Sequence, residues 1–188
     1  MGIATTLERE VKLSYESADA AREAILSAGA TPLHCRRLQE DALLDTADDS
    51  LRQRGCCLRI RMENGKSRIT FKGPVQPSTM KLRDEFETLI GDGVLLLRIF
   101  EELGFQVWFR YEKYREEYSH EGVIVAIDET PVGVFVEIEG SESGITAMAA
   151  AIGRGPADYI LDSYRGLFYQ RREALGLSGA DMVFDPPE

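Results

Sequence analysis

The stretch LEREVKLSY, residues 7–15, decides the fold. Its polar and apolar side chains alternate, as they do in a β-strand that is buried on one face. Side chains two residues apart on a strand point to the same face, so Glu8, Glu10 and Lys12 form one row. The opposite face carries Leu7, Val11 and Leu13. The stretch therefore predicts a strand with a row of charges behind a row of apolar side chains.

Doublets of charge with the same two-residue spacing recur further along the chain. Arg59 and Arg61 share a face of one strand-like run, and Glu137 and Glu139 share a face of another. The remaining charges of this kind are Lys72, Arg83, Glu85, Glu87, Lys113, Arg115 and, at the end of its run, Asp128.

These rows of charge have two interpretations. In any antiparallel sheet with one wet side, a polar face is simply solvated. A solvated face usually mixes hydroxyl, amide and charged side chains, however, whereas these rows are charged doublets. If the sheet closes with the charges inward, they have to pair with each other, with metal and with a polyanionic ligand, because burying an unpaired ion costs several kcal/mol.

The pattern of many short strands with few helices predicts an α+β domain built around a curved sheet or barrel. Ser17 is a helix cap, and Asn64-Gly65 is a strong hairpin signal. We expect helices at 18–28, 93–103, 143–152 and 162–175. We expect strands at 7–15, 35–44, 56–63, 67–72, 83–90, 105–118, 123–128 and 133–139. One domain over residues 1–175, with a C-terminal tail over 176–188 and a frayed end at 185–187, follows from this pattern.

Composition narrows the function. The 188 residues carry a formal net charge of −10, which argues against nucleic acid as a partner. No apolar run approaches the roughly 20 residues that span a bilayer, so we expect a cytoplasmic protein without membrane partners. The cysteines form no C-x-x-C motif, and His34 and His120 stand apart, so a zinc site or a histidine-based triad has no support.

The charge pattern itself favours one kind of chemistry. Paired carboxylates supply the oxygen ligands that Mg²⁺ or Mn²⁺ prefers. Clustered Lys and Arg side chains bind phosphate oxygens, since Arg offers bidentate hydrogen bonds and Lys a point charge. The combination indicates phosphoryl or nucleotidyl transfer. The sequence contains neither a G-x-x-x-x-G-K-[ST] loop nor an H-R-D motif, so the P-loop and kinase routes are excluded.

The E-x-E-x-K pattern of residues 8–12 resembles the signature of the CYTH family, also called the triphosphate tunnel metalloenzymes. Further segments resemble that family's motifs in the same order along the chain. They are residues 40–46, 58–61, 70–74, 83–87, 113–115, 128–129, 137–139 and 162–164. The similarity spans residues 7–167, and the ordered set is far more specific than any one of its motifs.

The resemblance implies an eight-stranded antiparallel β-barrel with flanking helices, which binds a triphosphate and a divalent metal in its tunnel. The family includes class IV adenylate cyclases, thiamine triphosphatases and inorganic triphosphatases. The chain looks most similar to proteins labelled class IV adenylate cyclase-like, a label that also covers hydrolytic members. Fold and site therefore carry over better than the reaction does.

Site residues also follow from the resemblance. It implies Glu8, Glu10, Glu137 and Glu139 as metal ligands, with Asp128 as a further ligand or as the acid that positions water. It implies a phosphate clamp made of Lys12, Arg59, Arg61, Lys72, Lys113 and Arg115. Within these sets, Asp128, Lys72 and Arg115 are the candidate catalytic residues.

Some roles stay open. Arg83 either joins the phosphate clamp or forms an ion-pair ladder with Glu85 and Glu87. Tyr164 is interpreted as a packing or capping residue. A basic residue near the C-terminus has three candidates, which are Arg165, Arg171 and Arg172.

Three functions fit this site. The leading hypothesis is a metal-dependent hydrolase of inorganic triphosphate, thiamine triphosphate or a nucleoside triphosphate. The alternative is an adenylate cyclase, in which the ribose 3′-hydroxyl attacks the α-phosphate of ATP and pyrophosphate leaves. A non-catalytic polyphosphate- or nucleotide-binding module is the third, although binding alone does not require the four glutamates. A homodimer is compatible with a small barrel of this kind.

Overall fold

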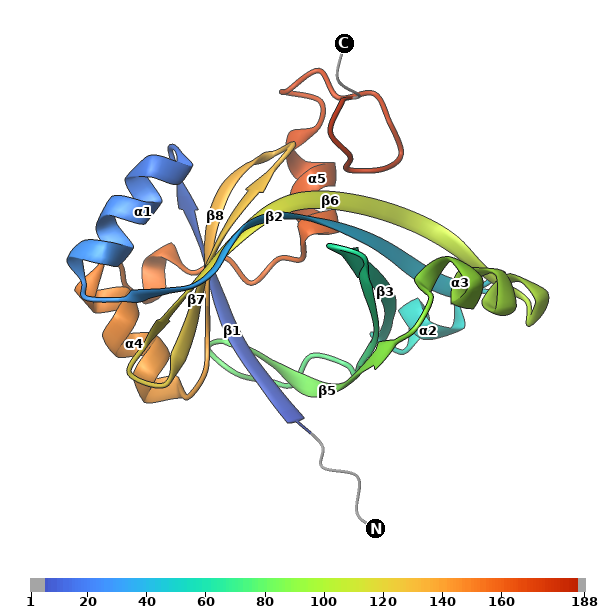
Figure 1. Cartoon of the computed structure of the whole chain (residues 1–188), viewed down its shortest axis with the longest axis horizontal. Helices are drawn as coiled ribbons and strands as arrows, with labels where there is room; N and C mark the ends of the chain where they lie inside the picture. Colours follow the sequence, from blue (N-terminus) through green and yellow to red (C-terminus); the bar gives the residue numbers. More distant parts are fainter. Residues whose placement is uncertain (1–5, 186–188) are drawn as a thin grey trace.

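The computed structural model describes residues 6–185, so most of the end expected to fray, Pro186 and Pro187, lies outside the described residues. Eight antiparallel strands close into a barrel in the order β1-β5-β4-β3-β2-β6-β7-β8 (Figure 1). The strands are β1 (Thr6–Tyr15), β2 (Thr31–Thr46), β3 (Cys57–Glu63), β4 (Lys66–Lys72), β5 (Lys81–Ile90), β6 (Phe105–His120), β7 (Val123–Thr130) and β8 (Gly133–Glu139). The predicted α+β barrel is confirmed.

Helices flank the barrel on several sides (Figure 1). They are α1 (Ala18–Ser27), α2 (Ser50–Gln53), α3 (Gly93–Glu102), α4 (Glu142–Ala151), the 3₁₀ helix η1 (Pro156–Asp158) and α5 (Tyr164–Arg171). The side chain of Ser17 accepts a hydrogen bond from the amide of Ala20 and caps α1, as predicted. Ser163 caps α5 in the same way through the amide of Gly166. This cap fixes where α5 begins, next to the barrel.

The apolar faces of the strands pack outward against helices. Val11 and Leu13 of β1 pack with Ile25 of α1 and Met148 of α4 in one core. A second core joins β2 and β3 to α2 and α3. Because burial of these faces against helices is the favourable arrangement, the alternating charged faces are left pointing into the barrel.

One apolar cluster lies inside the barrel, at one end. Phe109 and Tyr111 of β6 and Phe135 of β8 pack there against Tyr164 and Phe168 of α5. The helix therefore packs against side chains of β6 and β8, and its first turn lies beside the charged interior.

Several element limits differ from those that the sequence predicts. Strand β2 begins at Thr31 rather than at residue 35, and it pairs with β6 along its length across three irregularities in register. Such bulges shift the alternation of side chains, which hides the ends of the strand in the sequence pattern. Strand β5 begins at Lys81 rather than at Arg83, and α5 ends at Arg171 rather than at residue 175.

The residues after α5 return to the barrel. Met182 is fully buried and pairs with Tyr111 of β6, and the amide of Phe184 donates to Glu112. The limits of domain and tail stay a prediction. Among the described residues, no helix is both long and apolar enough to cross a membrane.

Candidate active site inside the barrel

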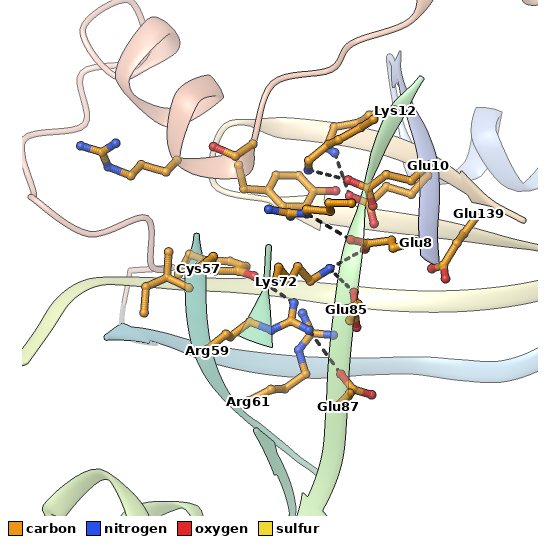
Figure 2. Close-up of a pocket in the computed structure, with 18 of the residues that line it drawn as sticks. Glu8, Glu10, Lys12, Cys57, Arg59, Arg61, Lys72, Glu85, Glu87 and Glu139 are labelled. Carbon is orange, nitrogen blue, oxygen red and sulfur yellow. Dashed lines mark hydrogen bonds and ion pairs between the residues drawn. The ribbon is translucent and has the colours of Figure 1, made fainter. Parts of the chain in front are cut away.

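A cavity of about 570 Å³ lies inside the barrel and is lined mainly by charged side chains (Figure 2). Its eleven basic residues are Lys12, Arg52, Arg59, Arg61, Arg68, Lys72, Lys81, Arg83, Lys113, Arg115 and Arg165. Its seven acidic residues are Glu8, Glu10, Glu85, Glu87, Glu117, Glu137 and Glu139. Of the site residues predicted from the sequence, all but Asp128 line this cavity.

Strands β1 and β8 bring four glutamates together. The register of this pair places Glu10 opposite Glu139 and Lys12 opposite Glu137. The ammonium of Lys12 lies 2.8 Å from Glu137. The spacing of two residues on each strand therefore puts all of these side chains on the inner face, as the sequence predicts.

Basic side chains from β4 and β5 pair with two of these acids. The carboxylate of Glu8 contacts the ammonium of Lys72 and lies 3.2 Å from Nε of Arg83. The ammonium of Lys81 lies 2.6 Å from Glu10. Burial acts to raise the pKa of Glu8 and of Glu10, but the neighbouring cations outweigh it and hold both pKa values below their ordinary range.

Glu139 differs from these acids because it has no ion pair with any residue that the structure describes. Glu139 is the last residue of β8 and its side chain is exposed; partial desolvation there, together with the negative charges of Glu8 and Glu10, raises its pKa to about 7. Figure 2 shows the carboxylate of Glu139 apart from Lys72, which pairs with Glu8. Uncompensated negative charge therefore gathers where β1 meets β8.

The donor set at this point fits a divalent metal ion. The side chains of Glu8, Glu10 and Glu139 offer only carboxylate oxygens, which hard cations such as Mg²⁺ prefer. The surplus charge at Glu139 is what a cation would neutralise. In the region that the structure describes, no three acidic, histidine or cysteine side chains already converge as a metal cage, because the glutamates contact Lys and Arg instead.

Asp128 of β7 lies behind the cavity wall and is fully buried. Its carboxylate accepts hydrogen bonds from Lys113 at 2.7 Å, from Arg115 at 2.7 Å and from the hydroxyl of Tyr164 at 2.5 Å. Both of its oxygens are thus occupied. This geometry suits an anchor for the basic side chains rather than a metal ligand or a water-positioning acid, the roles that the sequence suggests.

Tyr164 links α5 to this network. Besides donating to Asp128, its ring lies below the ammonium groups of Lys12 and Lys113, at 4.6 and 4.8 Å from the ring centroid. Desolvation and the neighbouring Arg115 lower the pKa of Lys113 to about 8. Tyr164 is a packing residue, as the sequence indicates, and it also lines the cavity and supports two of its cations.

Two arginines of β3 differ in how well they are paired. Arg61 makes a bidentate ion pair with buried Asp41 of β2, at 2.9 and 3.1 Å. The contacts of Arg59 with the described residues are longer, at 3.2 Å to Thr70, 3.4 Å to the hydroxyl of Tyr111, 3.4 Å to Asp41 and 3.5 Å to Glu87. Its guanidinium is therefore more available to an incoming anion than that of Arg61.

The charged residues of β5 pair with neighbouring strands, Arg83 with Glu8 of β1, and a role of Arg83 in a phosphate clamp stays a prediction. Glu85 lies 2.7 Å from Lys72, and Glu87 lies 2.6 Å from Arg68, so an ion-pair ladder is present. All three residues of β5 also line the cavity. Sequence analysis missed Lys81, although it stands two residues before Arg83 and so continues the same inward row.

Of the three basic candidates near the C-terminus, only Arg165 lines the cavity. Arg171 instead donates to the carbonyl of Val132, and Arg172 lies over Tyr169. Arg52 of α2 also lines the cavity and was missed because its helix is a single short turn.

Comparison with known proteins agrees with this architecture. The family model for the CYTH domain matches residues 6–154. A protein of Methanocaldococcus jannaschii named "putative adenylate cyclase" is 32% identical over 140 residues, which is 74% of this chain and 79% of that protein.

Solved structures show the same fold. A protein of Pyrococcus horikoshii is similar with a TM-score of 0.72 and 26% identity, over 88% of this chain and 99% of that one. A "putative adenylate cyclase" of Vibrio parahaemolyticus has a TM-score of 0.75 at 20% identity, over 87% and 98% of the two chains. A Hippeastrum protein, titled "putative adenylyl cyclase", has a TM-score of 0.63 at 21% identity, over 87% and 95%. The family model covers most of the chain, and the chain therefore belongs to the CYTH family.

Proposed function

We propose that this protein is a divalent-metal-dependent hydrolase of a triphosphate that binds inside the barrel. One observation carries the proposal. Basic side chains of several strands meet the glutamates of β1 and β8 inside one cavity, and Glu139 there has no basic partner among the described residues. Cations for a polyphosphate chain thus lie beside oxygen ligands for a metal.

The basic residues divide into two groups in this proposal. Arg59 and Lys72 bind phosphate oxygens directly, since Arg59 is poorly paired and Lys72 can release Glu85 or Glu8. Lys113 and Arg115 face the cavity while Asp128 fixes their orientation from behind. Charges held in place before the substrate arrives stabilise the charge that develops on the leaving phosphate, because no reorganisation is needed during the reaction.

The acidic residues hold the metal. Glu8, Glu10 and Glu139 are the proposed ligands, with Glu137 beside them. A bound Mg²⁺ or Mn²⁺ supplies charge neutralisation on the phosphate oxygens and activation of water. Glu139 also releases a proton in this proposal. Its pKa is raised, so its carboxyl group is partly protonated near neutral pH and loses that proton when a cation binds.

An adenylate cyclase is the second candidate, and the name of the Methanocaldococcus jannaschii relative favours it. The Hippeastrum protein, in contrast, is described as having a dominant triphosphatase activity despite its cyclase name. Both reactions need the same cations and acids and differ in the phosphorus atom that is attacked. We place hydrolysis first because the described lining offers many charges for phosphate and metal but no evident group dedicated to the ribose hydroxyl.

A substrate panel tests the proposal. The protein is incubated with ATP, inorganic triphosphate or thiamine triphosphate, each with Mg²⁺ or Mn²⁺, and released phosphate and cyclic AMP are measured separately. Phosphate without cyclic AMP is the expected result. Cyclic AMP with pyrophosphate would replace hydrolysis by cyclisation, and tight binding without any turnover would leave only a binding module.

A further inference from the structure

One end of the cavity carries an aromatic side chain that the proposed chemistry does not use. In the pairing of β2 with β6, Leu43 lies opposite Phe109 and Leu44 lies opposite Val107, so Trp108 is an extra residue in a β-bulge. Val107 points outward into the core beneath α3, and Phe109 points inward. A bulge re-aims the side chain that it contains, and Trp108 lines the cavity as a result.

Two arginines flank this indole. The guanidinium carbon of Arg52 lies 4.3 Å from the ring centroid of Trp108, and that of Arg165 lies 4.8 Å from it. We call Arg52, Trp108 and Arg165 the tryptophan rim. The indole is half-buried, so the rim is part of the wall and still open to the cavity.

The two arginines are not equivalent. Arg52 is paired with Asp45 at 3.2 Å and also with Asp49. Arg165 has no carboxylate partner among the residues that the structure describes, and its buried Nε has no hydrogen-bond partner there. Arg165 is therefore a planar cation that is held by aromatic rings, since Tyr169 lies on it at 4.9 Å, and not by an acid.

The rim adjoins the phosphate-binding cations. Leu43 of β2, which also lines the cavity, lies opposite Arg59 of β3 in the strand register. Cys57 stands two residues before Arg59, on the same inner face of β3. Figure 2 shows Cys57, Arg59 and Lys72 side by side. Leu43, Cys57 and Trp108 also belong to one apolar cluster, so this end of the lining offers apolar as well as cationic side chains.

We propose that the tryptophan rim binds the neutral aromatic base of a nucleoside triphosphate whose phosphates lie at Arg59 and Lys72. The inference rests on the proposed function and specifies its substrate class. Indole and guanidinium planes are the surfaces on which nucleobases stack, whatever the base. Inorganic triphosphate has no group to place there.

The charge of the rim discriminates between organic triphosphates. The guanidinium groups of Arg52 and Arg165 attract the electron-rich face of a neutral base, whereas they repel a head group that is itself a cation. Thiamine triphosphate carries such a cationic ring. The rim therefore favours a nucleoside triphosphate over both thiamine triphosphate and inorganic triphosphate.

Trp108 is the only tryptophan of the sequence, so its fluorescence reports on the rim alone. The full-length protein is titrated with ATP and with inorganic triphosphate in the presence of Ca²⁺, with excitation at the long-wavelength edge of indole absorption, where adenine absorbs little. We expect ATP to quench the emission and inorganic triphosphate to restore it by displacing ATP. Equal quenching by both ligands would overturn the proposal.

Two variants complete the test. In Trp108→Leu, isothermal titration calorimetry should show ATP binding weakened about tenfold or more, as loss of one stacking partner implies, and inorganic triphosphate binding changed less than about twofold. Tyr114→Leu is the matched control, because its ring lies 3.7 Å from the guanidinium of Arg36 in a comparable pair that does not line the cavity. It should leave both affinities unchanged.

The outcomes separate the two proposals. If wild-type protein binds both triphosphates and Trp108→Leu weakens them equally or not at all, the rim has no role in base binding, while the proposed function stands. If wild-type protein binds neither triphosphate, the proposed function fails and the rim inference falls with it.

Discussion

Glu10 of β1 lies directly opposite Glu139 of β8 in the antiparallel register of the barrel. Lys81 neutralises Glu10 at 2.6 Å, but no described residue forms an ion pair with Glu139. When two carboxylates face each other and a cation pairs with one of them, protonation of the other is favoured. Desolvation, with the negative charges of Glu8 and Glu10, raises the pKa of Glu139 to about 7, so its protonation depends on pH near neutrality and on any bound cation.

The first prediction concerns stability and pH. Because the folded chain holds the Glu139 proton more tightly than an unfolded chain with the ordinary pKa of 4.5, the unfolded state binds fewer protons between pH 4.5 and about 7. Glu139 therefore destabilises the metal-free protein progressively as pH rises through this window. Glu139→Gln should remove this contribution, so its melting temperature should exceed that of the wild type more at pH 7.5 than at pH 5.

The measurement is a series of thermal melts in EDTA at several pH values. Glu101→Gln on α3 is the matched control, because Glu101 is exposed and pairs only with Arg98. It should follow the wild-type profile. A constant difference between Glu139→Gln and wild type at every pH would contradict the assignment.

A second prediction concerns the metal. Glu139 has no basic partner among the described residues, and a triphosphate bound beside it brings further negative charge, so turnover should require a divalent cation at this point and be lost on chelation. Mg²⁺ binding should also release protons at pH 6, where Glu139 is largely protonated, and far fewer at pH 8. Calorimetry in buffers of different ionisation enthalpy measures this release. Full turnover in excess EDTA would rule out the proposed site.

The third prediction separates acids from bases. Glu139→Gln should lower kcat far more than it weakens substrate binding, because a metal ligand acts mainly on the transition state. Arg59→Ala should mainly raise KM, since it removes a contact that already exists in the ground state, and each lost charged hydrogen bond costs about 1.5–3 kcal/mol. Steady-state kinetics measures both values.

Arg98→Ala on α3 is the control for the arginine variant, because its side chain is exposed and is not part of the cavity lining. It should change neither kcat nor KM. The opposite pattern, with Glu139→Gln raising KM and Arg59→Ala lowering kcat, would mean that the metal and phosphate roles are assigned to the wrong residues even though the barrel is right.

Much of the barrel could be predicted from the sequence because most of its strands alternate charged and apolar side chains regularly. On β1, Glu8, Glu10 and Lys12 stand opposite Val11 and Leu13, and the spacing alone places them on the inner face. The alternation of side chains along a strand shows which of them share a face of the sheet, and a closed sheet has only one inner face. Hence nearly all predicted site residues meet in one cavity.

What lies next to each charge could not be predicted in the same way. Asp128 has the same sequence signal as the cavity glutamates, but Lys113, Arg115 and Tyr164 cover its carboxylate, and Tyr164 comes from a helix 36 residues away in the sequence. Trp108 was missed because a bulge in β6 sets the direction of its side chain. A bulge interrupts the two-residue alternation from which the inward-facing side chains were predicted. The surroundings of Asp128 and the direction of Trp108 both depend on tertiary contacts rather than on strand spacing.

The last prediction tests Asp128 as an anchor. Asp128→Ala leaves the buried cations of Lys113 and Arg115 without their main acid, and removal of one partner from a buried ion pair costs about 3–5 kcal/mol. Tyr164→Phe removes a single hydrogen bond to the same carboxylate and should cost about 1.5–3 kcal/mol. Urea denaturation of the metal-free protein at one pH measures both changes in the free energy of unfolding.

Tyr15→Phe is the matched control for the tyrosine variant. The hydroxyl of Tyr15 is buried, as that of Tyr164 is, but it has no hydrogen-bond partner among the described residues. Its loss should therefore leave the free energy of unfolding within about 0.5 kcal/mol of the wild type or raise it. If Tyr164→Phe were as stable as Tyr15→Phe, or if Asp128→Ala kept wild-type stability while losing all turnover, Asp128 would act on the substrate or the metal, and the anchoring role would have to be given up.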